Sequence, residues 1–200
     1  MEKIKIIALV GSLRNDSLNR QLAHEAGEIL DKLAGKASKK LDFLIPDYSD
    51  VPMFNRDIEY PAPRAISGLR EIIKSANGVW FFTPEYNHFF PGVLKNLIDW
   101  LSRPISETEQ QVLAGKAAAI SGITPGISGT LIAQDHLVTL FSFLNMKIMN
   151  QPRLSIPRAM EQTDQDGRLK LDTSRQFLEK QAEAFLGFIE RQFILYSKIT

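Results

Sequence analysis

Residues 4–11 read IKIIALVG, a short run of mostly apolar, β-branched residues that ends at a glycine. Such a run is typical of a strand that is buried on both faces of a parallel sheet. Similar runs return at 41–45 (LDFLI), 78–82 (GVWFF) and 117–123 (AAAISGI), and a shorter one stands at 147–150 (KIMN). Helical patterns separate these runs. Strands alternating with helices predict an α/β fold with a mainly parallel sheet.

The segments between the strands carry apolar residues at helical spacing. The first helix is expected to begin at a cap on Asp16 or Ser17 and to end at Gly35. Further helices are predicted around residues 66–73, 91–103, 131–145 and 174–196. The Pro-rich stretches 46–63 and 151–173 are expected to be a loop and a surface excursion, respectively.

The composition is that of an ordinary globular protein, with 44% hydrophobic and 24% charged residues, and we expect a single domain over residues 1–200. The chain has no cysteine, which excludes disulfides, thiolate zinc sites and cysteine nucleophiles. The formal net charge is +1, so nothing indicates a nucleic-acid or anionic-membrane partner. The longest apolar run, Ile6 to Val10, is far short of the roughly 20 residues of a membrane span. With no signal peptide recognised, a cytoplasmic location is expected.

Three loops after predicted strands carry the chemistry. GSLRNDSLNR (11–20) follows the first strand and precedes a helix. The backbone N–H groups at a helix start favour an anion, and Ser12, Arg14, Ser17 and Asn19 add donors, so a phosphate is the expected ligand. The same residue types are also ordinary turn and cap residues, and both readings stay open. The P-loop and GxGxxG patterns are absent.

TPEYNHFFPG (83–92) follows the third strand and combines an aromatic ring, a carboxylate and an amide, which suits a flat heteroaromatic ligand. For Phe89 and Phe90, packing against neighbours or a partner subunit is the preferred interpretation. SGITPGISGT (121–130) follows the fourth strand, and its three glycines allow close approach of the backbone to a ligand. In the strand order 2-1-3-4-5 of flavodoxin-like folds, the loops after strands one and three lie side by side, and together they describe an FMN pocket.

Other site chemistries have less support. The three histidines, His24, His88 and His136, do not have the spacing of a zinc motif, so no metal site is predicted. The GxSxG elbow of a serine hydrolase is missing. Asp99 lies on an apolar helix beside Trp100 and is expected to make a structural contact.

The chain resembles the flavodoxin-like NADPH-dependent FMN reductases, which include quinone, chromate and azo-dye reductases. The resemblance runs through GSLRNDSLNR, VPMFNRDIEYP (51–61), PEYNHFFPGVLKNLIDWLSRP (84–104), LAGKAAAISGITPG (113–126) and MKIMNQP (146–152). It implies that Ser12, Arg14, Ser17 and Asn19 hold the FMN phosphate, that the isoalloxazine is lined by Pro84, Glu85, Tyr86 and Asn87, and that its other edge meets Ser121 and Gly122. One stretch departs from the family pattern. Where a Gly-Gly pair and an arginine are common, the chain reads Gly129-Thr130-Leu131-Ile132, which bears on nucleotide or substrate preference.

These features predict an FMN-bound oxidoreductase that takes a hydride from NADPH or NADH and passes two electrons to a small electrophile such as a quinone. No catalytic side chain is named, because the flavin supplies the chemistry. The alternative is a flavodoxin-type single-electron carrier, although such carriers are strongly acidic and this chain is not. A third possibility is a flavin-free scaffold. Phe89, Phe90 and the apolar helices at 91–103 and 174–196 suggest subunits that cover each other's sites, and the family implies a homodimer or homotetramer.

Overall fold

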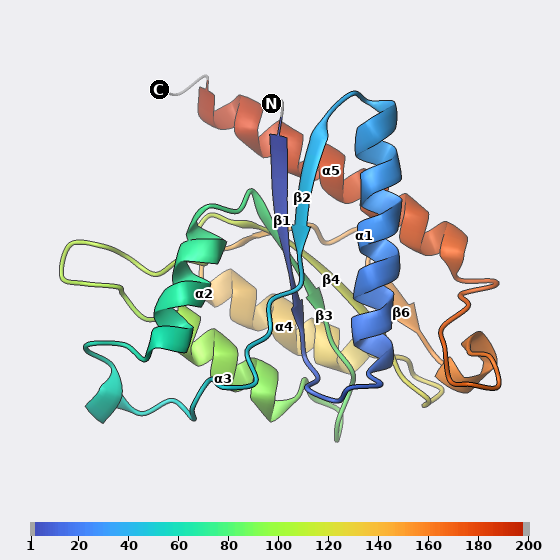
Figure 1. Ribbon diagram of the computed structural model, residues 1–200, viewed down its shortest axis with the longest axis horizontal. Coiled ribbons are helices and arrows are strands. Elements are labelled where there is room, and N and C mark those ends of the chain that lie inside the picture. Colours follow the sequence, from blue (N-terminus) through green and yellow to red (C-terminus); the bar gives the residue numbers. More distant parts are fainter. Residues whose placement is uncertain (1–2, 198–200) are drawn as a thin grey trace.

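The computed structural model describes residues 3–197, with side chains up to Gln192 in the last helix. A parallel sheet runs through the middle of the molecule and helices cover both of its faces (Figure 1). Its strands lie in the order β2-β1-β3-β4-β5, which confirms the prediction, and β6 also pairs with β4. The strands are β1 (Lys3–Val10), β2 (Lys40–Leu44), β3 (Gly78–Phe82), β4 (Ala117–Ile123), β5 (Lys147–Ile148) and β6 (Leu154–Ile156).

Five α-helices and two short 3-10 helices are assigned within the described residues. They are α1 (Leu18–Lys36), α2 (Arg64–Lys74), α3 (Gly92–Leu101), α4 (Leu131–Phe143), α5 (Arg175–Ser197), η1 (Arg56–Ile58) and η2 (Ala159–Gln162). None of these helices is both long and apolar enough to cross a membrane.

The alternation of side chains along the strands divides the core into two parts. Ile6 and Trp80 point to the face covered by α1 and α5. Ile7 and Phe81 point to the opposite face, which α2, α3 and α4 cover. Every residue of β3 and β4 is buried, as expected for central strands of a sheet with two covered faces.

The first helix starts as predicted but ends later. Ser17 is its N-cap and accepts a hydrogen bond from the Arg20 N–H at 3.3 Å. Gly35 does not end the helix, because a glycine stops a helix when it adopts a left-handed conformation and Gly35 stays helical. Ser38, with φ of 53°, makes the reversal instead.

The interpretation of residues 151–173 as a surface excursion is wrong. The fifth strand has only two residues, and they pair with the first half of β4. The second half of β4, Ser121–Ile123, pairs with β6, so one edge of β4 is covered by two short strands in succession. Leu154, Ile156 and Leu171 are consequently buried in the core. The alternating pattern of β6 has only two apolar residues, Leu154 and Ile156, and it lies among prolines and polar residues. It was therefore not recognised as a strand in the sequence.

The loop between β2 and α2 is fastened to α3. The side-chain amide of Asn96 accepts from Phe54 N–H at 2.7 Å and donates to the Pro52 carbonyl at 2.9 Å. Trp100 Nε1 donates to the same Pro52 carbonyl at 2.9 Å. These bonds connect the VPMFN stretch (51–55) to the KNLIDW stretch (95–100). Asp99 pairs with Lys95 at 2.7 Å, a structural contact as predicted.

Candidate functional site: a crevice at the carboxyl ends of three strands

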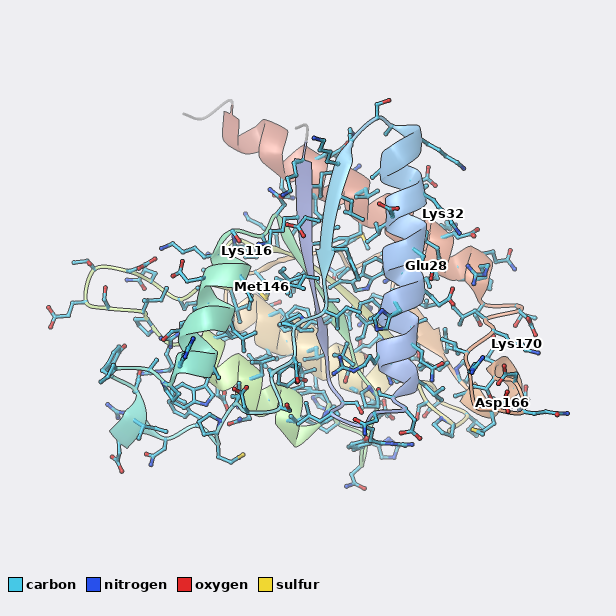
Figure 2. The ribbon with its side chains drawn as sticks, in the orientation of Figure 1. Glu28, Lys32, Lys116, Met146, Asp166 and Lys170 are labelled. Carbon is cyan, nitrogen blue, oxygen red and sulfur yellow. The ribbon has the colours of Figure 1, made fainter. Side chains whose placement is uncertain are left out.

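The loops that follow β1, β3 and β4 meet at one end of the sheet, at the bottom of Figure 1. They form a small crevice with an enclosed volume of about 90 Å³, lined by Ser12, Arg14, Ser17, Leu18, Asn19, Pro84, Tyr86, Ile123, Thr124 and Pro125. The carboxyl ends of parallel strands are the usual ligand site of an open α/β sheet. Lys116, which Figure 2 labels beside α2, precedes β4 and therefore marks the opposite end of the sheet.

The first side of the crevice is the loop 11–17 and the start of α1. Ser12 and Ser17 are both nearly buried here. The N–H groups of Leu18 and Asn19 belong to the first turn of α1, where a helix supplies no acceptor. Among the described residues no other acceptor is recorded for them. Two free N–H groups at a helix start, next to two hydroxyls, form a place for an anion.

Arg14 stands at the rim of this loop. Its guanidinium donates to Asp16 from Nε at 3.1 Å and from Nη2 at 2.6 Å. These hydrogen bonds raise the pKa of Arg14 and lower the pKa of Asp16. The side chain of Arg14 remains 67% exposed, so its remaining donors can reach a ligand.

Asn19 connects the start of α1 to β4 through its side chain. Its side chain is buried and donates to the Ile123 carbonyl at 2.9 Å, while Ile123 N–H donates back to Oδ1 at 3.1 Å. Each polar atom of the amide thus has one partner on Ile123, and Nδ2 keeps a second N–H. Asn19 lines the crevice, and it ties the start of α1 to the end of β4.

The second side is a tight turn after β3. Tyr86 and Phe89 exchange two backbone hydrogen bonds of 2.9 and 3.0 Å. Asn87 and His88 between them are both left-handed, with φ of 51° and 58°. This turn is of the two-residue hairpin kind. Tyr86, which lines the crevice, is 51% exposed as a residue, and Asn87 is exposed at the tip of the turn.

The neighbours of Tyr86 support the turn. The Glu85 side chain is only 7% exposed, accepts a hydrogen bond from Ala133 N–H at 3.0 Å and lies 3.5 Å from His88 Nδ1. Glu85 therefore fixes the turn to the start of α4. Phe90 is buried, whereas Phe89 is partly exposed and packs against the His136 ring at a centroid distance of 4.2 Å.

The structure does not bring the side chain of Ser121 to the crevice. Its hydroxyl is fully buried, accepts from Trp80 Nε1 at 2.8 Å and donates to Gln181 at 2.6 Å. Gly122 lies against Thr83 and Thr130, so its missing side chain serves internal packing. Thr124 and Pro125 line the crevice in place of the predicted Ser121 and Gly122. The predicted strand ends at residue 123, and that boundary already indicated where the loop begins.

The loop after β4 (124–130) is hydrogen-bonded to β6 and to the residues that follow it. Thr124 N–H donates to the Ile156 carbonyl and Arg158 N–H donates to the Gly126 carbonyl. Further along, Thr130 is buried and its N–H donates to Ser155 Oγ at 2.8 Å. Leu131 and Ile132 follow and are exposed. In the family pattern a Gly-Gly pair and an arginine are common at 129–132. This chain instead exposes the apolar side chains of Leu131 and Ile132 there.

Comparison with known proteins decides which family this arrangement represents. A family model described as NADPH-dependent FMN reductase matches residues 4–161, most of the chain. The chain belongs to this family. The predicted family, flavodoxin-like fold, oxidoreductase class and FMN cofactor are confirmed.

Similar proteins of this reductase family match over nearly their whole length. A 2-hydroxy-1,4-benzoquinone reductase from Burkholderia sp is 36% identical over 186 residues, which cover 93% of this chain and 96% of that protein. A quinone reductase from Escherichia coli K12 is 36% identical over 193 residues, with 95% and 97% covered. The solved structure of FerB, a flavoenzyme NAD(P)H:(acceptor) oxidoreductase from Paracoccus denitrificans, is 33% identical and matches with a TM-score of 0.77, covering 94% of this chain and 98% of that one.

Proposed function

We propose that this FMN reductase family member takes a hydride from NAD(P)H and passes two electrons to small electrophiles, with quinones as the acceptor class. The observation that carries the proposal is the meeting of an anion-binding helix start with the exposed ring of Tyr86 across one crevice. The names of the relatives support the acceptor class. No finding favours the flavodoxin-type electron carrier.

The residues of the crevice fit FMN. Ser12, Ser17 and the first-turn N–H groups of α1 would hold its phosphate, with Arg14 closing the rim. Pro84 and Tyr86 would line the ring system on one side, and Thr124 and Pro125 on the other. The crevice volume of about 90 Å³ is small for a whole flavin nucleotide, so part of the bound cofactor would lie outside it.

Bound FMN supplies hydride transfer, accepting from NAD(P)H and donating to the acceptor. The protein's part is to bind and orient. The Tyr86–Phe89 turn is fixed to α4 through Glu85, and Asn19 fixes the start of α1 to β4. These contacts hold both sides of the crevice at a constant separation. We assign no acid or nucleophile among the side chains.

The function is tested by mixing the FMN-loaded protein with NADPH without oxygen and then adding a benzoquinone. Bleaching of the yellow flavin absorption by NADPH and its return with the quinone are expected. Because both substrates use one open flavin face, initial-rate plots against either substrate should be parallel, as in ping-pong kinetics. An absorption spectrum unchanged by NADPH would instead support the electron carrier.

Replacing Arg14 by alanine is expected to weaken FMN binding by about tenfold to a hundredfold, the usual range for a lost charge-assisted hydrogen bond. Riboflavin binding should change little, because riboflavin has no phosphate for Arg14 to meet. Fluorescence titration of both flavins measures the difference. Arg64→Ala on α2 is the matched control, since Arg64 is an exposed arginine away from the crevice. Equal losses for both flavins in R14A would contradict the phosphate assignment.

A homodimer or a homotetramer is part of the proposal. Exposed apolar side chains gather near the crevice: Phe89 and Ile127 on its loops, Ile127 being 81% exposed, and Leu131 and Ile132 at the start of α4. The expected role of the last helix in assembly concerns in part Phe193 and Tyr196, whose side chains lie outside the described residues. A cytoplasmic location and a single functional unit over residues 1–200 also stay predictions.

The apolar loops give the oligomer prediction its test. Ile127→Glu with Leu131→Glu should convert the oligomer to monomers, because each change places a charge in the contact. Light scattering measures the mass, and Ile58→Glu on η1 is the control for a charge placed on another exposed apolar residue. A wild-type protein that is an active monomer at dilute concentration would contradict the prediction.

A further inference from the structure

A second hollow shares Arg14 with the FMN crevice. Its volume is about 340 Å³, and its walls are Leu13, Arg14, Asn15, Arg20, Asp47 and Ser49. The first four residues come from the loop after β1 and the start of α1, and the last two follow β2. The two spaces share Arg14 as a common wall. Arg14 is also close enough to Tyr86 for an electrostatic interaction.

The hollow combines cationic donors with one fixed anionic acceptor. Asp47 accepts from Ser49 N–H at 2.9 Å, and hydrogen bonds from Ser49 are the main cause that lowers the pKa of its carboxyl, with the charge of Arg20 adding to the effect. Asp47 is therefore an ionised acceptor held in place by its own turn. The guanidinium groups of Arg14 and Arg20 supply donors for phosphate oxygens.

We propose that this hollow binds the adenosine–phosphate end of the nicotinamide nucleotide. The inference rests on the proposed function, which requires a nucleotide much longer than the flavin crevice. Arginines pair with phosphate oxygens, and a carboxylate accepts hydrogen bonds from ribose hydroxyls. Both groups occur next to each other in the adenosine half of NAD(P)H. Arg14 connects the hollow to the flavin site, so one nucleotide can reach from this hollow to the crevice.

Arg20 and Asp47 separate this assignment from flavin binding, because they line the second hollow and not the FMN crevice. Arg20→Gln keeps length and polarity while removing the charge. Asp47→Asn keeps the oxygen that accepts from Ser49 and removes the negative charge. Arg191→Gln serves as the control, because Arg191 is an exposed arginine near the end of α5 and does not line the hollow.

The experiment measures ADP binding to the FMN-loaded protein by calorimetry. ADP is expected to bind the wild type and the R191Q control alike, and at least tenfold more weakly to R20Q and D47N. The KM for NADPH should rise by a similar factor in R20Q and D47N, with kcat nearly unchanged. FMN content, and reoxidation by benzoquinone after reduction with dithionite, should not change.

Each of the following outcomes would overturn the proposal. ADP that does not bind the wild type, or binds both variants as tightly, excludes an adenosine site here. Loss of FMN from R20Q would instead assign the hollow to the flavin phosphate. An unchanged KM for NADPH in both variants, with NADPH still reducing the flavin, contradicts this inference alone. Failure of NADPH to reduce the wild-type flavin contradicts the proposed function, and the inference fails with it.

Discussion

Replacing Gly122 by alanine is expected to destabilise the protein by about 3 kcal/mol or more, the upper range for forcing atoms into a packed core. A Cβ at this position would lie 2.2 Å from Thr130 Oγ1 and 2.3 Å from the Thr83 carbonyl oxygen. The carbonyl is backbone, and Thr83 N–H is itself bonded to the Ser121 carbonyl at 2.9 Å. The strands cannot separate locally without losing such bonds. Urea unfolding followed by circular dichroism measures the loss.

Gly68→Ala is the matched control for this substitution. Gly68 lies inside α2, and an added Cβ there meets nothing within 4 Å. Alanine at an open helical position is expected to stabilise by about 0.5–1 kcal/mol. The loss in G122A should be the same with and without FMN. A G122A protein of wild-type stability that no longer binds FMN would contradict this account and restore the role in cofactor contact that the sequence suggested.

Replacing Gln181 by leucine is the second change with a large expected effect. The Gln181 amide is fully buried and donates to the carbonyls of Ile120 at 2.9 Å and Pro152 at 3.0 Å. It also accepts from Ser121, which in turn accepts from Trp80. Leucine would remove the amide that donates to two buried carbonyls and the acceptor of the Ser121 O–H, and each lost bond costs about 1–3 kcal/mol. We expect a total loss of about 3 kcal/mol or more in urea unfolding.

The control for Gln181 is Gln176→Leu, the same chemical change at an exposed position of α5. Its expected effect is within about 0.5 kcal/mol. Ser121→Ala extends the test, because it removes the acceptor of Trp80 and should lower stability while FMN affinity stays unchanged. If S121A weakened FMN and left stability intact, Ser121 would belong to the flavin site after all.

Features that depend on neighbouring residues were predictable from the sequence. Strands such as 78–82 and 117–123 have the predicted bounds, because their composition is unlike that of the flanking turns. Ser17 caps α1 as one of the two expected residues, since a cap acts on an N–H only three residues away. The family block PEYN with PGVLKN-IDW indicated the reductase family, and the comparisons confirm it.

The role of a polar side chain in a site loop was decided only by the tertiary structure. Asn19 bonds to Ile123, which is 104 positions away, and Ser121 bonds to Gln181, 60 positions away. A serine or asparagine in a loop can face a ligand or the core, and its residue type is the same in both cases. The choice depends on sheet register and on which helix packs behind the strand.

The same reason applies to the segment after β5 and to the second hollow. The sequence by itself determined the α/β class through local patterns and the family through a long specific motif, and the strand order was expected from the flavodoxin-like fold. Only the tertiary structure placed β6 against β4, and only it brought Arg20 on α1 beside Asp47 after β2. Such contacts join residues that are distant in the chain, so local propensity contains no information about them.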